Sequence, residues 1–403
     1  MLPIRALGSS YIKAIPGFLI YPLFYIVLLL IIIQYARAAG VEKRLWGRPR
    51  HAILKQVLIS LFFGVLGGFV GSLLLLGVGV ALSGSWMLYV WVVALALAFV
   101  SARLMCFAYA GGIVALSSLL LGWPKLDISS LLALVALLHA VESLLMFMSG
   151  HLGAIPVNVK NSHGDIVGGF SLQKFWPVPL LALAIIPQLL PDGIGSIPMP
   201  DWWPLISPHT LTENFSFWMI PVVAGLGYGE LAISTNPKKR ARESAAKLAG
   251  YSLVLFFLAY LSTKSIFFLY LGALFAPIGH ELLVWTTSRK EMAGRPLYGG
   301  SSVGLQLLDI MPQSPAARSG LAQGDIILSA DGWPILTAGQ LEAVLLQSQG
   351  QICLVTNRGL RYLSAPLTLR DSGVVPVPDE DTNIYLETRF HSPFDFIAKL
   401  IGR

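Results

Sequence analysis

The sequence predicts a polytopic α-helical membrane domain followed by a small α+β domain. Of the 403 residues, 55% are hydrophobic and only 12% are charged, and the mean hydropathy is +0.70. Soluble domains carry about a quarter charged residues. Long apolar runs stop near residue 290, after which short apolar stretches alternate with glycine and proline turns. We therefore expect a multi-span domain over 1–290, a small domain over 291–370, and a flexible or amphipathic tail over 371–403.

Nine apolar segments are candidates for spanning helices, since a helix needs about 20 residues to cross a bilayer. We expect six to nine of them to span, because the first, fourth and sixth are short or interrupted by proline. The segments are 16–35, 57–82, 86–100, 107–123, 129–148, 178–190, 217–233, 248–262 and 265–285. The second carries Gly64, Gly67, Gly68 and Gly71, and small residues at such spacing allow helices to pack closely in lipid.

Between the fifth and sixth segments the hydrophobicity drops, which indicates an extramembrane insert over 151–176. Apolar and polar residues alternate there around a turn at 161–164, a pattern typical of a β-hairpin. Residues 191–215 contain acidic side chains but no Lys or Arg, which suits the outer face of the membrane.

Basic residues flank the apolar runs, and this placement predicts orientation. They cluster at 43–50, 238–242 and 289–295, and cytoplasmic loops carry an excess of Lys and Arg. The chain is thus expected to be a multi-pass membrane protein with a cytoplasmic C-terminus. The net charge of +7 is explained by this pattern and by attraction to anionic lipid. Nucleic acid is not an expected partner.

The small domain contains a specific motif. A glycine-rich loop from Gly299 leads into an apolar strand at 303–310, and Ser314-Pro315 begin a short helix. A second strand follows Asp325, and the chain turns at Asp331-Gly332. The run Ser-Pro-Ala-Ala-x-x-Gly-Leu-x-x-Gly-Asp-x-Ile-Leu resembles PDZ domains of the bacterial type.

A PDZ domain binds an extended peptide by adding it to a sheet edge. We expect that edge at 303–308, the opposite wall at the helix 338–347, and a nest of N–H groups for a carboxylate at 300–304. The predicted peptide-binding residues are Gly300, Val303, Gly304, Leu305, Leu307, Leu341, Val344 and Leu345. Packing in the domain core is the alternative role for these apolar side chains.

Five ionisable residues fall within apolar segments: His139, Glu142, Glu230, His280 and Glu281. Such groups are costly in a bilayer and mark candidate functional sites. Buried contacts between helices, a proton or ion pathway, and an intramembrane metalloprotease are the alternatives. The protease needs His-Glu-x-x-His, but Val284 stands at the second His position. The two cysteines, Cys106 and Cys353, show no metal-ligand spacing. The sequence therefore predicts no catalytic residue, no metal ligand and no cofactor.

The whole chain is similar to a known family. Gly-Gly-Phe-Ser-Leu-Gln-Lys-Phe-Trp-Pro at 168–177, Pro-Ile-Gly-His-Glu at 277–281 and one terminal PDZ-like domain resemble the MinJ family of Gram-positive bacteria. The resemblance implies a non-enzymatic scaffold that links the pole protein DivIVA to the division inhibitor MinD and so places the septum. The competing functions are a PDZ-regulated intramembrane metalloprotease and a PDZ-bearing transporter.

Overall fold

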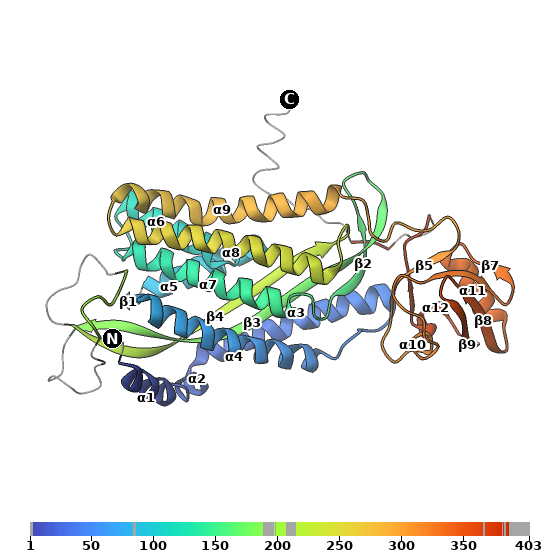
Figure 1. Cartoon of the computed structure of the whole chain (residues 1–403), viewed down its shortest axis with the longest axis horizontal. Coiled ribbons are helices and arrows are strands. Elements are labelled where there is room, and N and C mark those ends of the chain that lie inside the picture. Colours follow the sequence, from blue (N-terminus) through green and yellow to red (C-terminus); the bar gives the residue numbers. More distant parts are fainter. Residues whose placement is uncertain are drawn as a thin grey trace, which may run out of the picture.

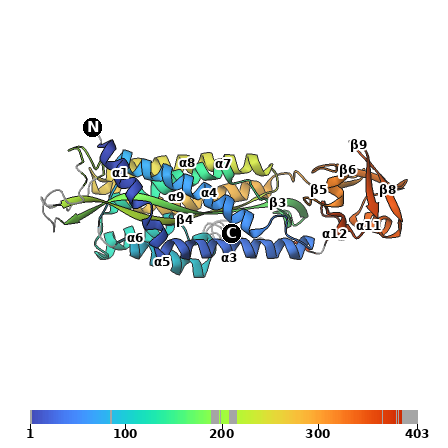
Figure 2. The same cartoon turned by 90° about the horizontal axis from the view of Figure 1, so that it is seen from below.

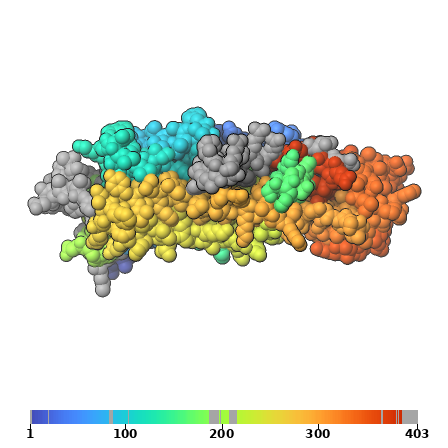
Figure 3. Space-filling view, turned by 90° about the horizontal axis from the view of Figure 1, so that it is seen from above, coloured from blue at the N-terminus to red at the C-terminus, as the bar shows by residue number. Residues whose placement is uncertain are grey.

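The structure, a computed structural model, is an elongated body with a helical domain at one end and a small β-rich module at the other (Figures 1 to 3). It describes residues 3–83, 86–187, 197, 199–206, 215–365, 367–380, 382 and 384–386. The helices of the large domain lie along the long axis (Figure 1).

The large domain combines helices with one long sheet. Its helices are α1 (Ile4–Ala14), α2 (Gly17–Ile20), α3 (Pro22–Trp46), α4 (Ile53–Val78), α5 (Trp86–Val100), η1 (Ala102–Leu104), α6 (Phe107–Leu121), α7 (Ile128–Ser149), α8 (Pro237–Ser262) and α9 (Ile266–Ala293). Its strands are β1 (Ala81–Ser83), β2 (Ile155–Lys160), β3 (Ile166–Pro187) and β4 (Phe215–Ala232).

Among the described residues, five helices are long and apolar enough to cross a membrane: α3, α4, α7, α8 and α9. Large apolar side chains on their outer faces are exposed, as at Leu58, Phe62 and Leu253. Such a surface is stable in lipid and costly in water. The prediction of a multi-pass helical membrane domain is confirmed.

The prediction that two of the apolar segments are spanning helices is wrong. The segments 178–190 and 217–233 contribute instead to β3 and β4, which pair antiparallel from Phe170↔Ala232 to Pro187↔Phe215. Proline lacks the N–H that a helix interior needs, and Pro177, Pro179 and Pro221 lie in these strands. The alternation predicted for the insert continues along β3, and the predicted hairpin, β2 paired with β3, is its beginning.

Helix α4 packs against the backbone of strand β3 at very close range. A side chain at Gly64 or Gly68 would overlap the carbonyl oxygen of Pro177 or Pro179, respectively. Ser72, on the same helix, accepts a hydrogen bond from the Leu181 N–H at 2.8 Å. Non-helical backbone at membrane depth is tolerated only where protein buries it or a cavity receives it. The glycines of α4 therefore allow the helix to bury the strands.

Helices α5 and α6 form a short hairpin whose tip reaches the middle of the bundle. Each has 15 residues, about 22 Å of helix, against a hydrocarbon core of about 30 Å. At one end Tyr89 and Trp123 are in ring contact. At the other end Arg103 and Cys106 contact residues near the centres of α7 and α9. This arrangement is re-entrant, as seen where irregular backbone is buried inside protein.

The second basic segment belongs to a helix rather than a loop. Asn236 caps α8 through the N–H of Lys238, and Pro237 occupies the first turn, so residues 238–242 form its first turns. Arg240 pairs with Glu291 near the end of α9. Arg50, from the first basic cluster, pairs with Asp309 of the C-terminal module. The basic clusters at 43–50 and 238–242 thus lie at the end of the bundle that carries this module (Figure 1).

The C-terminal module is a PDZ-like antiparallel sheet with a helix packed against it. Its strands are β5 (Leu305–Ile310), β6 (Ile326–Ala330), β7 (Trp333–Pro334), β8 (Gly350–Thr356), β9 (Gly359–Ala365) and β10 (Val374–Pro376). Its helices are α10 (Pro315–Arg318), α11 (Ala338–Gln347) and α12 (Leu369–Ser372). The strand order is β10-β5-β6-β8-β9, with β7 on β6. A Thr337–Gln340 capping box begins α11.

The expected tail starts with ordered structure. Strand β10 pairs with β5, and Val374, Val375 and Val377 are buried. Beyond it, the Leu386 N–H donates to the Asn158 carbonyl of β2. Burial of these valines explains the order that the proline-rich, acidic composition did not predict. The rest of the expected tail, from residue 387 onward, lies outside the described residues.

The module docks on the membrane domain through one face of β5. Leu308, Met311, Val375 and Val377 join the core of the membrane domain, where Phe170 and Tyr298 also lie. Leu307, one residue earlier on β5, points instead into the separate core of the module. Successive side chains of a strand point to opposite faces, so β5 serves both cores.

Because α4 packs closely on β3, we expect alanine substitutions at two glycines of α4 to differ in their effect on stability. Gly68→Ala places a Cβ against a backbone oxygen and should lower the free energy of unfolding by about 3 kcal/mol, the upper part of the range for overpacked sites. Gly77→Ala meets no atom within 4 Å and should leave stability unchanged or slightly raised. Thermal unfolding in detergent measures both, and equal melting temperatures would contradict the packing.

The two faces of β5 predict separable defects. Leu307→Ser should unfold the C-terminal module, since loss of a buried leucine costs roughly 2–5 kcal/mol. Leu308→Ser should release the module from the membrane domain while leaving it folded. Hydrogen exchange in the full-length protein distinguishes them: the β8 and β9 amides should lose protection in the first variant alone. Loss of protection in both would mean that the module is stable only when docked.

Candidate functional site

The predicted peptide-binding edge is covered by the chain itself. Strand β5 pairs with β6 on one side and with β10 on the other. The Val377 N–H extends this pairing by donating to the Gln306 carbonyl at 2.9 Å. An incoming peptide therefore finds no free edge on β5, because β10 occupies the position where a peptide strand would add.

The covering segment also follows helix α11. The Leu367 N–H donates to the Leu345 carbonyl at 3.3 Å, and the Leu369 N–H donates to Glu342 Oε1 at 3.3 Å. At the other end of the helix, the Ala338 N–H donates to Asp379 Oδ2 at 3.0 Å. We call residues 367–379 the covering segment. It runs antiparallel to α11 and takes the place between strand and helix that the sequence assigned to a peptide.

The outer edge of the covering segment offers few hydrogen-bond donors. The Val374 N–H is bonded to Ser372 Oγ at 3.2 Å, and Pro376 and Pro378 have no N–H. Prolines on an edge strand oppose the addition of another strand. With the covering segment in place, which we call the closed form, the domain is therefore poorly suited to adding a further strand to its sheet.

The residues predicted to bind peptide lie in different environments. Leu305, Leu307, Leu341 and Leu345 are buried in the module core, and Val344 packs against it. Gly304 approaches the Ile327 carbonyl so closely that a side chain would overlap it. Val303 is 65% exposed, and Gly300 is exposed with φ of +86°. The leucines thus have the core role given as their alternative, while peptide binding by the group stays a prediction.

One ion pair connects this module to the membrane domain. Arg50 pairs with Asp309, which is buried in β5. Burial raises the pKa of the Asp309 carboxyl, and the Arg50 guanidinium opposes that shift. The pair fixes the loop after α3 against the module.

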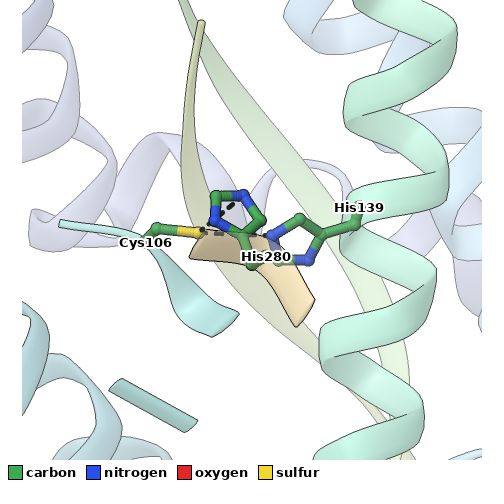
Figure 4. A group of neighbouring side chains, drawn as sticks. All are labelled: Cys106, His139 and His280. Carbon is green, nitrogen blue, oxygen red and sulfur yellow. Dashed lines mark hydrogen bonds between the residues drawn. The ribbon is translucent and has the colours of Figure 1, made fainter. Parts of the chain in front are cut away.

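Two of the predicted intramembrane residues meet a third that the sequence did not single out. His139 of α7 and His280 of α9 converge on Cys106, which caps the N-terminus of α6 (Figure 4). Cys106 Sγ lies 3.2 Å from His139 Nε2 and 3.9 Å from His280 Nε2. One donor atom from each residue lies within 4.8 Å of the others, so the group can hold a metal ion.

The surroundings of this cluster are largely aromatic. His139 and His280 are in ring contact with each other, and Tyr251 contacts both rings. Tyr109 contacts His280 from α6. Glu142, one turn after His139, places Oε2 3.9 Å from His139 Nε2. The cluster is thus a polar group between α6, α7 and α9, in which His139 is buried and the other two residues are partly buried, with one carboxylate beside it.

Glu281 is held away from this chemistry. Its carboxylate pairs with Arg103 of the re-entrant tip and accepts a hydrogen bond from the Tyr109 hydroxyl at 2.6 Å. In a His-Glu-x-x-His protease the glutamate acts as a general base beside the metal. Here the carboxylate instead anchors the tip of the α5–α6 hairpin to α9.

Glu230 belongs to a separate network in β4. Its Oε2 lies 2.8 Å from Arg240 Nε and accepts hydrogen bonds from Ser244 at 2.6 Å and Tyr228 at 3.1 Å. Arg240 also pairs with Glu291, which accepts from the N–H groups of Ile233, Ser234 and Thr235. This network joins β4, α8 and α9. It matches the predicted alternative of buried contacts between elements.

Cys106 is the residue that sequence reasoning missed. The three converging residues are 33 and 141 positions apart along the chain, so no ligand spacing is visible. The available signal was a cysteine between two short apolar segments, at the point where the re-entrant hairpin turns.

Comparison with known proteins agrees with the architecture. Residues 307–358 match the PDZ domain family. The chain is 22% identical over 377 residues to the cell division topological determinant MinJ of Bacillus subtilis (strain 168). The match covers 86% of this chain and 88% of that protein, so it includes most of the helical domain. This chain is therefore a polytopic membrane protein with a C-terminal PDZ domain and is a distant homologue of MinJ.

Proposed function

We propose that this protein is a membrane-anchored adaptor in the placement of the cell-division site. The observation that carries the proposal is the similarity to a cell division topological determinant along 86% of the chain, together with the separate match of residues 307–358 to the PDZ domain family. A PDZ domain binds proteins and peptides. The helical domain supplies the membrane location, and the docked module supplies the binding surface.

The proposed partners are a DivIVA-like polar scaffold and a MinD-like division inhibitor in the cytoplasm. Orientation supports access to them. The basic clusters at 43–50 and 238–242 lie at the PDZ end of the bundle, and basic segments of membrane proteins remain on the cytoplasmic side. A PDZ domain on the cytoplasmic side of a multi-pass protein of the bacterial cell membrane can reach both proposed partners.

The covering segment sets how the domain engages a partner strand. In the closed form, residues 367–379 occupy the place between β5 and α11. A partner strand that uses this place must displace the segment, and the cost of displacement lowers its affinity. Val303 and Val344, which are not fully buried, then become contacts for the incoming chain.

A non-enzymatic role fits the membrane domain better than an intramembrane protease. Val284 stands where the second histidine of the protease motif is required, and Glu281 is bound to Arg103 and Tyr109. A general base must reach the proton that it abstracts. In this arrangement the Glu281 carboxylate holds the tip of the α5–α6 hairpin against α9 through Arg103 and Tyr109.

Loss of the PDZ domain predicts loss of division-site control. Cells that produce only residues 1–304 should place septa near poles, and the truncated protein should no longer capture DivIVA-like and MinD-like proteins from native membranes. The full-length protein, with the same tag, is the control. Normal septa together with unchanged capture would contradict the adaptor function.

Substitution of Val303 and Val344, the two proposed contacts for a partner strand, should weaken partner binding while the protein stays folded. The double variant Val303→Asp, Val344→Ser should lower partner affinity at least about tenfold, equivalent to about 1.4 kcal/mol. Leu360→Asp, an exposed site on the distant strand β9, is the matched control. Binding to purified full-length variants measures the effect. Equal loss in both variants would place the partner surface elsewhere.

A further inference from the structure

The Cys106–His139–His280 cluster has the composition of a metal site. It offers one thiol sulfur and two imidazole nitrogens from three separate elements of the fold. Zinc is bound by such donors, usually four in a tetrahedron. Hard cations such as Mg²⁺ and Ca²⁺ prefer oxygen ligands. The donor set therefore selects a borderline or soft metal ion.

We propose that Cys106, His139 and His280 bind one zinc ion at the centre of the membrane domain. Tetrahedral zinc with ordinary bond lengths separates sulfur from nitrogen by about 3.6 Å. The two sulfur–nitrogen distances here are 3.2 Å and 3.9 Å, one on each side of that value. Small side-chain rotations bring the three donors to ligand distance.

The hydrogen bonds of the histidines leave the required lone pairs available. His139 Nδ1 lies 2.7 Å from the Val135 carbonyl. A carbonyl only accepts, so Nδ1 carries the proton and Nε2 presents its lone pair toward Cys106. His280 Nδ1 is buried without a hydrogen-bond partner among the described residues. The His280 ring can thus present a nitrogen to the ion without breaking an existing bond at Nδ1.

Charge balance favours Glu142 as the fourth ligand. A dication bound by one thiolate carries a net positive charge, which is costly in an apolar interior. The Glu142 carboxylate lies 3.9 Å from His139 Nε2, and its coordination makes the site neutral. Binding of the ion releases the Cys106 thiol proton to solvent. The filled site ties the re-entrant tip to α7 and α9, which supports a structural role that is independent of the PDZ function.

Metal content of the purified full-length protein tests this proposal. After extraction without chelators, elemental analysis should find one zinc per chain. Cys106→Ser and His139→Ala should each reduce the zinc content at least about tenfold, because each removes one ligand from a site type that is almost always four-coordinate. Cys353→Ser removes the other free cysteine, in β8, and should keep the full zinc content. Zinc at background in the native protein, or retained after loss of Cys106, would overturn the proposal.

Cobalt replacement provides a second measurement if a variant folds poorly. Protein loaded with Co²⁺ should show thiolate-to-cobalt charge-transfer absorption, which Cys353→Ser keeps and Cys106→Ser loses. A cluster held only by thiol–imidazole hydrogen bonds would give no such band in any variant, and that result would also reject the metal site.

Discussion

Hydrogen bonding of the β3–β4 backbone is the constraint on which the rest of the membrane domain depends. Two long strands lie inside an apolar bundle, where an unpaired N–H or carbonyl costs several kcal/mol. Pairing with β4 satisfies the hydrogen-bonding groups along one edge of β3, and on its other edge the Leu181 N–H donates to Ser72 Oγ. The approach of α4 through Gly64 and Gly68 buries the remaining surface. A side chain at either glycine would overlap the backbone of β3 and prevent this approach.

Alternation along β3 divides the domain into two packed faces. Leu172, Trp176, Val178 and Leu180 point into the core that contains α7, and the Trp176 indole donates to Ser149 at 3.2 Å. Phe175 faces the other side and packs with α3. A strand buried on both faces reads as a continuous apolar run. This explains why its sequence resembles that of a spanning helix.

Irregular backbone also creates the polar centre of the bundle. The α5–α6 hairpin stops halfway, so its tip brings Arg103 and Cys106 to the middle of α7 and α9. There Arg103 neutralises Glu281, and Cys106 meets two histidines. Discontinuous helices place binding groups at the membrane midplane in many transport proteins. In this chain the same geometry gathers ligands for a proposed structural ion.

The sequence by itself determined the membrane character and the PDZ motif, and it marked His139 and His280 as ionisable residues within apolar segments, because hydropathy, turn chemistry and rare intramembrane polar groups are local signals. Only the tertiary structure decided that residues 178–187 and 217–232 are strands, since length and hydropathy do not separate a buried strand from a helix. It alone placed Cys106 with the histidines and β10 beside β5. Those contacts join residues far apart in the chain, and no local pattern encodes which distant segments pack together.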